Sequence, residues 1–117
     1  MAQRLNLQAE LAQIVADVLD ISLEEVSQKR KVIGQVPKNI TLTYPCIKYS
    51  LSRVDMKHAN NAAYREKRYY QIILIDKEPE GPLFDRLLKI PHIRLDRNDV
   101  VENLYHYYFT LLYIGGN

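Results

Sequence analysis

The chain has 117 residues, a length typical of one domain, and we expect residues 1–117 to fold as a single unit. Hydrophobic residues make up 47% and charged residues 26% of the chain, which is ordinary for a globular domain and argues against extensive disorder. The only cysteine, Cys46, excludes an internal disulfide, and three histidines argue against a four-ligand structural zinc site. No apolar run approaches the ~20 residues that cross a bilayer, and residues 1–10 lack the apolar stretch of a signal peptide. We therefore expect no membrane contact and assembly inside a cell.

The charge is unevenly distributed along the chain. The net charge of +2 is too small to indicate a nucleic-acid partner, but residues 31–76 hold eight basic against three acidic side chains. Residues 1–30 and 77–117 each have a slight acidic excess. The basic middle fits a solvated hairpin whose lysines discourage edge pairing. It also fits a surface that meets an acidic partner or nucleic acid, and both interpretations stay open.

The N-terminal part of the chain has the apolar spacing of an amphipathic helix over residues 3–19. Ser22 and Glu25 fit a capping box, in which Ser22 caps the helix and Glu25 reaches back, so a short second helical turn follows over 23–29. Residues 1–30 thus form an N-terminal helical segment. The apolar positions of the first helix are Leu7, Leu11, Ile14, Val15 and Val18.

The middle of the chain predicts a long β-hairpin. Residues 31–45 read as an irregular connector with room for one short strand, and residues 46–54 alternate as a half-buried strand does. Residues 55–63 are polar and turn-prone, and residues 64–76 predict a long strand that is buried toward its end. The hairpin would protrude, with a polar and basic tip. In the first strand Ile47, Tyr49 and Leu51 share one side, and Lys48, Ser50 and Ser52 share the other.

The C-terminal part predicts a short helix and two further strands. Pro82 suits a first helical position and Pro91 disfavours further helix, so the helix covers 82–90. Residues 92–97 and 104–114 are dense in strand-forming residues.

These elements predict an α+β fold. A mainly antiparallel sheet over residues 44–114, with the helix 82–90 inserted, would have the N-terminal helix and this second short helix packed on one face. The first helix should lie across the sheet. We expect the following core residues to be largely buried: Leu11, Ile14, Ile47, Ile73, Ile75, Leu87, Phe109 and Leu111.

Catalytic motifs are sparse. The four glycines form no phosphate-binding fingerprint, and Cys46 at the start of a strand reads as a small buried thiol rather than a nucleophile. Asp99, Glu102 and His106, close to Asp96, would share one face of a helix over 98–113 and could then hold a divalent metal. The run of aromatic and β-branched residues favours a strand instead, entered through a charged turn. We therefore expect no catalytic residue, no metal and no cofactor, with His106 hydrogen-bonded inside the sheet.

The nine tyrosines all lie between Tyr44 and Tyr113. Tyrosine combines area, rigidity and a polar tip, which suits either the packing of a sheet or a protein interface. Tyrosines interleaved with Arg65, Lys67 and Arg68 also fit a surface on which single-stranded bases stack. All three interpretations stay open.

Several short motifs occur in a characteristic order over residues 44–113, and this order resembles the small tail-terminator or tail-completion proteins of long-tailed double-stranded DNA bacteriophages and prophages. The N-terminal helix fits by position, and residues 20–43 form a longer insertion than that family pattern has. The matching pieces are Pro45-Cys46-Ile47-Lys48-Tyr49-Ser50; Asp55, Lys57, Ala59, Asn60, Asn61 and Tyr64; Tyr70 to Asp76; Leu88, Ile90-Pro91 and Leu95-Asp96-Arg97; and Val101, Asn103-Leu104, His106 and Phe109-Thr110-Leu111.

The resemblance implies a virion structural protein and not an enzyme. Its subunits would form a ring, usually a hexamer, that caps the head-proximal end of the tail tube in the virion after assembly in the host cytoplasm. Its partners would be other copies of itself, the tail tube protein and the head–tail connector or neck proteins, with DNA passing through the ring without sequence-specific binding. A head-completion or neck adaptor ring, a nucleic-acid-binding module and a metal-dependent hydrolase are the alternatives.

The predicted hairpin is the part of the chain that we expect to contact a neighbouring subunit or another virion protein. An isolated two-stranded ribbon is marginally stable in water, and this one has few apolar side chains at its tip. Its basic side chains would also repel one another unless Asp55, Glu66 or carboxylates of a partner lay close by. The predicted interface residues are Arg53, Lys57, His58, Asn60, Tyr64, Arg65, Lys67 and Arg68.

Overall fold

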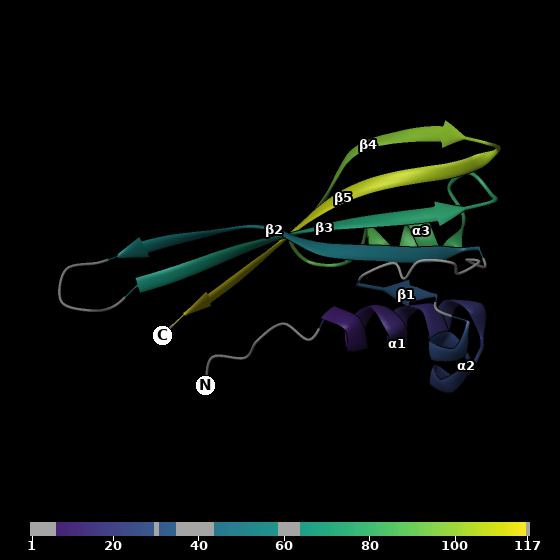
Figure 1. Ribbon diagram of the computed structural model, residues 1–117, viewed down its shortest axis with the longest axis horizontal. Helices are drawn as coiled ribbons and strands as arrows, with labels where there is room; N and C mark the ends of the chain where they lie inside the picture. Colours follow the sequence, from purple (N-terminus) through teal and green to yellow (C-terminus); the bar gives the residue numbers. More distant parts are fainter. Residues whose placement is uncertain (1–6, 30, 35–43, 59–63, 117) are drawn as a thin grey trace.

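The computed structural model describes residues 7–29, 31–34, 44–58 and 64–116, with the side chains of 56–58, 64–66 and 114–116 outside this description. Helices pack on a mostly antiparallel sheet, so the predicted α+β class is confirmed (Figure 1). The elements are α1 (Leu7–Leu19), α2 (Leu23–Gln28), β1 (Val32–Ile33), β2 (Cys46–His58), β3 (Tyr64–Asp76), α3 (Pro82–Leu87), β4 (Ile93–Val101) and β5 (Leu104–Gly116).

The sheet has the strand order β1-β2-β3-β5-β4. The short β1 pairs with β2 in parallel, and every other neighbouring pair is antiparallel. β4 is longer than the predicted strand over 92–97, because it continues into a tight hairpin with β5. The two turn residues, Glu102 and Asn103, have φ values of 51° and 65°. Positive φ at both central residues is the type I′ geometry, whose twist matches that of the paired strands.

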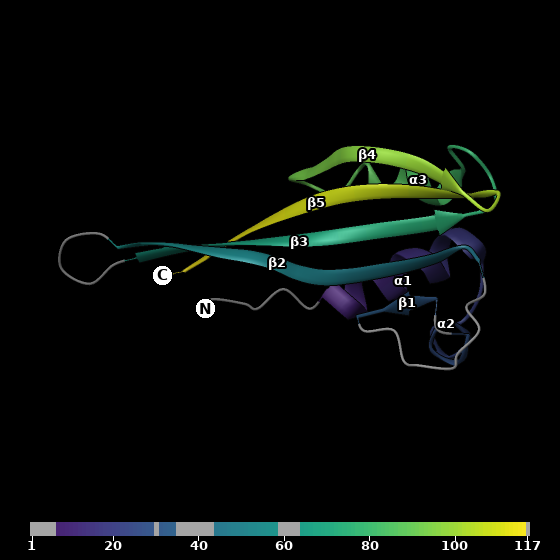
Figure 2. The same ribbon diagram turned by 45° about the horizontal axis from the view of Figure 1, so that its top comes forward.

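Helices α1 and α3 lie on the same face of the sheet, which we call the helix side (Figures 1 and 2). The core forms between them and the alternate residues of β2, β3 and β5 that point to this side. Phe84 of α3 packs on Tyr107 and Phe109 of β5, with ring centroids 4.4 and 5.9 Å away. The side chains with almost no exposed surface include Leu11, Val15, Ile47, Ile72, Leu74, Leu83, Leu87 and Phe109.

Two of the predicted core residues lie on the opposite face. Ile73 pairs with Lys48 and Tyr108 and is only partly buried, so its predicted burial was wrong. Successive side chains of a strand point to opposite faces, so Ile73 points away from the face that buries Ile72. The helices do not cover the face to which Ile73 points. Ile75 shares that face, yet it is 3% exposed as predicted. The other six predicted core residues are buried on the helix side.

The helix ends follow local sequence signals. Ser22 caps α2 as predicted, because its Oγ accepts a hydrogen bond from the Glu25 amide at 3.1 Å. The Glu25 carboxylate, however, accepts from Lys29 Nζ at 2.9 Å, one helical turn ahead. α3 begins at Pro82 and ends at Leu87, and a turn over 88–90 replaces the last part of the predicted helix. None of the helices in the described ranges is both long and apolar enough to span a bilayer.

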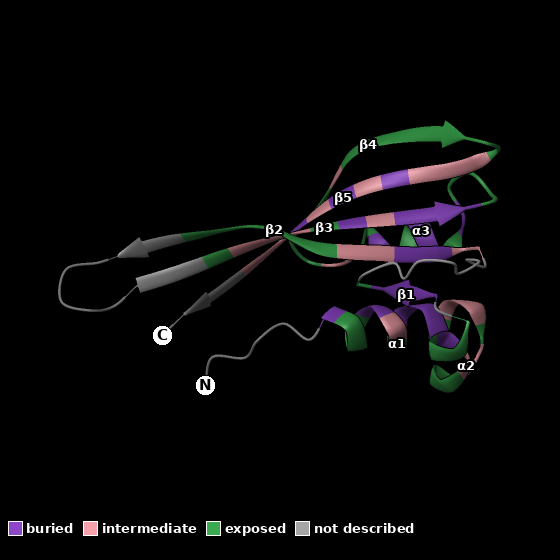
Figure 3. Cartoon of the chain, in the orientation of Figure 1, coloured by how far each residue is buried: buried purple, intermediate pink, exposed green. Residues whose placement is uncertain are grey.

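Three strands continue past the helices as a narrow extension that we call the ribbon (Figure 1). β2 and β3 stay paired as far as His58 and Tyr64, and β3 and β5 as far as Arg65 and Gly116. The sequence predicted two strands here, whereas β5 provides a third because it pairs with β3 as far as Gly116. The described helices lie over the other end of the sheet, and the described side chains of the ribbon are exposed or half-buried (Figure 3).

Candidate interaction surface

The face of the sheet opposite the helices, here called the open face, has no described element packed on it (Figure 2). Its side chains come from alternate positions of β2, β3, β5 and β4, and many of them are aromatic or charged. A sheet face with this composition can bind a partner through stacking and ion pairs. The open face includes Lys48, Ser50, Arg53, Asp55, Lys67, Tyr69, Gln71, Ile73, Arg94, Arg97, Asp99, His106, Tyr108, Thr110 and Leu112.

Arg53 and Tyr69 form one stacked pair on the open face, at the base of the ribbon. The Arg53 guanidinium carbon lies 4.2 Å from the centre of the Tyr69 ring. Arg53 NH2 also lies 3.5 Å from a carboxylate oxygen of Asp55, and Lys67 is the direct cross-strand neighbour of Asp55. All of these charged side chains are exposed, so the pairs orient the guanidinium more than they stabilise the fold.

A second stack crosses β4 and β5. The Arg97 guanidinium carbon lies 4.2 Å from the centre of the Tyr108 ring. The His106 ring is inclined by 21° to the Tyr108 ring, with the two centroids 6.5 Å apart. Arg97 also lies 3.8 Å from a carboxylate oxygen of Asp99. The sequence analysis missed this group. Its only signal was the spacing of His106, Tyr108 and Thr110, since alternate residues of a strand share one face.

Asp96 is the extra residue of a β-bulge in β4, between Leu95, which pairs with Phe109, and Arg97, which pairs with Tyr108. Its carboxylate accepts a hydrogen bond from the Thr110 hydroxyl and another from Arg94 Nε at 2.8 Å. The hydrogen bond from Thr110, followed by the charge and hydrogen bond of Arg94, lowers the pKa of Asp96 below its ordinary value. Two strands of the open face, β4 and β5, are thereby joined at a single carboxylate.

The predicted interface residues divide between the two faces of the sheet. Arg53 and Lys67 are on the open face, whereas Arg68 pairs with Val54 and Tyr113 on the helix side. Sequence proximity suggested one basic cluster, but the pleat separates neighbours such as Lys67 and Arg68. Lys57, His58, Tyr64 and Arg65 lie in β2 and β3, with Lys57 opposite Arg65 and His58 opposite Tyr64 in register, and their side chains lie outside the described residues. Asn60 lies outside them entirely.

The carboxylates near the last hairpin do not adopt the helical arrangement that a metal site would need. Residues 98–113 contain no helix; Asp99 and His106 are cross-strand neighbours, and Glu102 is in the turn. His106 Nδ1 lies 3.2 Å from the Leu104 carbonyl oxygen, in keeping with the predicted hydrogen bond. Across the described part of the chain, no three His, Cys, Asp or Glu side chains group closely enough to hold a metal.

Cys46 is fully buried at the start of β2, as predicted for a small structural thiol. Burial raises the pKa of its thiol to about 11. Since the thiolate is the nucleophilic form, this environment suppresses the reactivity of Cys46 at neutral pH.

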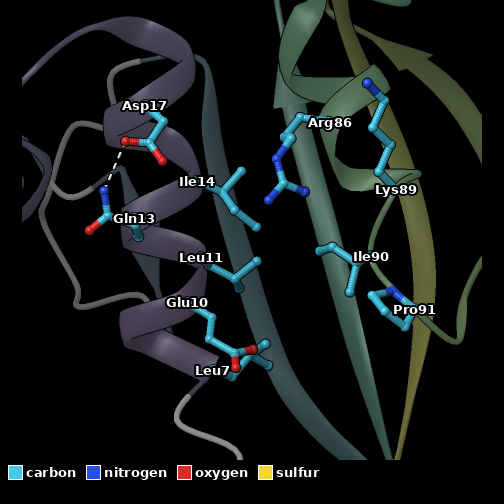
Figure 4. A pocket seen from close by; sticks show the side chains of 10 residues that line it. All are labelled: Leu7, Glu10, Leu11, Gln13, Ile14, Asp17, Arg86, Lys89, Ile90 and Pro91. Carbon is cyan, nitrogen blue, oxygen red and sulfur yellow. Dashed lines mark hydrogen bonds between the residues drawn. The ribbon is translucent and has the colours of Figure 1, made fainter.

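A groove of about 380 Å³ runs between α1 and α3 on the helix side (Figure 4). Its floor is apolar and includes Leu11, Ile14 and Ile90. Glu10 and Asp17 line the α1 wall, and Arg86 and Lys89 line the α3 wall. The sequence analysis missed this groove, because it depends on how two helices distant in sequence pack side by side.

No protein-family model matches the chain, and no curated protein matches it either. The surfaces of the molecule and the order of its sequence motifs are therefore the features from which a function can be inferred.

Proposed function

We propose that this protein is the tail terminator of a long-tailed bacteriophage or prophage, a subunit of a ring that caps the head-proximal end of the tail tube and joins it to the head connector. The three-stranded ribbon is the observation that carries the proposal. It extends past the helices (Figure 3), and the alternation of its strands directs side chains to two opposite faces. The sequence motifs over residues 44–113 support the same role.

Exposed apolar side chains on the ribbon support a binding role. Leu51 is 50% exposed and Val54 is 40% exposed, although both are in the longest hairpin of the sheet. An extended ribbon with few buried contacts gains little stability from its own packing. Contact with a neighbour would bury these side chains and stabilise the ribbon at the same time.

The two faces of the sheet also suit a ring. A closed ring with cyclic symmetry uses heterologous contacts, in which one patch of a subunit meets a different patch of the next. The chain has such distinct patches in the open face, the ribbon and the α1–α3 groove. The open face carries both Arg and Asp side chains, which can select a partner and its orientation through complementary charge.

Electron microscopy of the purified protein, alone and with tail tubes, tests the proposal. We expect rings with a central hole, and tubes that stop growing and are capped at one end when the protein is added. Rings that leave the tubes uncapped would favour a head-completion or neck adaptor instead. A protein that forms no ring under either condition would contradict the proposal.

A charge-reversal variant tests the part played by the ribbon. Arg65→Glu combined with Arg68→Glu should leave the chain folded but impair ring formation and tail joining. Lys29→Glu combined with Lys77→Glu makes the same change of charge away from the ribbon and should have no such effect. Normal rings and infectious particles from the ribbon variant would contradict this role. Loss of DNA binding with assembly intact would favour a nucleic-acid-binding module.

A further inference from the structure

The helix side of the ribbon carries a strip of apolar and aromatic side chains that continues the core. Leu51 pairs with Tyr70, which pairs in turn with the buried Leu111. One step further out, Val54 and Tyr113 flank Arg68 in the same register. We call Leu51, Val54, Arg68, Tyr70 and Tyr113 the ribbon strip. Its side chains are exposed or half-buried, because α1 and α3 cover only the other end of this face (Figure 3).

A β-bulge creates the strip. The register of β2 shifts between Leu51 and Arg53, so Ser52 is an extra residue relative to β3. Without the bulge, strict alternation would place Val54 on the open face with Lys48 and Ser50. The shift instead brings Val54 to the same side as Leu51. Leu51 and Val54, the exposed aliphatic residues among the ribbon side chains that the structure describes, therefore point in one direction.

The α1–α3 groove offers apolar and acidic side chains to such a strip (Figure 4). Leu11 and Ile14 close the bottom of the groove and are almost fully buried, so the apolar surface that it offers to aliphatic side chains comes from Ile90 and Pro91. Glu10 and Asp17 on the α1 wall can meet the guanidinium of Arg68. The strip contains one cation and no carboxylate, so in the docked position Arg68 must lie against this acidic wall and away from Arg86 and Lys89 on the opposite wall.

We infer that the ribbon strip of one copy of this protein docks in the α1–α3 groove of a second copy. The inference rests on the proposed ring and assigns its subunit contact to two different patches of the same chain. A strip and a groove cannot meet within one molecule, because the ribbon extends away from the helices (Figure 1). Each copy therefore gives a strip to one neighbour and receives a strip from the other, which is the head-to-tail contact that a closed ring needs.

Site-directed cross-linking tests the contact. Glu10→Cys places a thiol on the acidic wall and Val54→Cys places one on the strip, both at exposed positions. The native Cys46 is buried and does not compete. An equimolar mixture of the two single variants, treated with a short bis-maleimide, should give a covalent dimer on a denaturing gel. Either variant alone should stay monomeric on the same gel.

A matched control replaces the groove position with Val101→Cys at the far end of β4, where the side chain is also exposed. The mixture of Val54→Cys with Val101→Cys should give no dimer. Val54→Asp should weaken self-association by at least about tenfold, since it places a carboxylate beside Glu10 and Asp17. Sizing by sedimentation measures this change.

The outcomes separate the inference from the proposed function. If the protein forms rings but gives no cross-link between positions 10 and 54, the inferred contact is wrong and the proposed function still stands. A dimer from Val54→Cys alone would show that ribbons meet each other, which also overturns it. A wild-type protein that stays monomeric at about 1 mM, and forms no ring with tail tubes, would overturn both.

Discussion

The hydroxyl of Thr110 in β5 donates a hydrogen bond to the carboxylate of Asp96, the extra residue of the bulge in β4. Arg94 donates a second hydrogen bond to the same carboxylate. Asp96 therefore ties the edge strand to its neighbour at the point where the regular ladder is interrupted. A bulge with a charged residue also makes the β4 edge a poor template for strand addition, so a partner is better placed on the faces of the sheet.

The Asp96 interaction predicts a pH-dependent contribution to stability. The folded state lowers the pKa of Asp96 below its ordinary value of 3.8, so the stabilisation is present above that pH and is lost as the pH falls through the folded-state pKa. Asp96→Asn should therefore destabilise the protein at pH 6, and the difference from wild type should shrink toward pH 2. Urea unfolding at both pH values measures it. Asp85→Asn, at an exposed helical position, serves as the control, and equal differences at both pH values would contradict the prediction.

Leu11 should be a strong determinant of stability. Its side chain has no exposed surface and anchors α1 to the sheet, so Leu11→Ala removes apolar contacts and leaves a cavity. We expect the free energy of unfolding to fall by about 2–5 kcal/mol. Leu23→Ala truncates the same side chain where it is 51% exposed and should change that free energy by less than about 0.5 kcal/mol. Equal effects in chemical denaturation would show that α1 is not packed on the sheet.

Replacing Gly34 with alanine, which adds only a methyl group, should destabilise the folded protein. A Cβ there would lie 3.0 Å from the Tyr49 hydroxyl oxygen, and that hydroxyl is held by a 2.6 Å hydrogen bond to Gln8 Oε1. Gly34→Ala should lower the free energy of unfolding by about 1–3 kcal/mol through overpacking.

A double-mutant cycle checks the cause of that effect. Tyr49→Phe removes the hydroxyl that Gly34→Ala would crowd, so the cost of the alanine should be smaller in the Tyr49→Phe background. Thermal unfolding of the four proteins measures the coupling. Additive effects would mean that the Tyr49 hydroxyl is not the limiting contact.

Cys46 should react slowly with thiol reagents in the folded protein. Burial raises its thiol pKa from the ordinary 9.0 to about 11, so almost no thiolate is present at pH 8. We expect a disulfide-forming chromogenic reagent to label Cys46 at least about a hundredfold faster in denaturant than in buffer. The same raised pKa predicts that the neutral Cys46 thiol contributes to the free energy of unfolding below pH 9, and that this contribution is lost as the pH rises toward 11. Rapid labelling of the native protein would contradict the buried position.

Local patterns in the sequence were sufficient to predict the class of fold and most of its elements. The apolar spacing around Leu11 predicted α1, Ser22 predicted the start of α2, and the residues from Tyr64 to Asp76 predicted β3 at its observed bounds. Each of these signals depends on residues a few positions apart, because helices repeat every 3.6 residues and strands every two. The burial of Cys46 was also predicted from its place at the start of a half-buried strand.

Only the tertiary structure determined which residues share a surface. The bulge at Ser52 moves Val54 to the helix side, and the bulge at Asp96 moves Arg97 over Tyr108. A bulge is a property of a strand and its distant partner, so strict alternation within one strand cannot reveal it. The third strand of the ribbon and the α1–α3 groove likewise arise from pairing and packing between segments far apart in the chain. The helices and strands could therefore be predicted from the sequence, whereas the grouping of their side chains into surfaces could not.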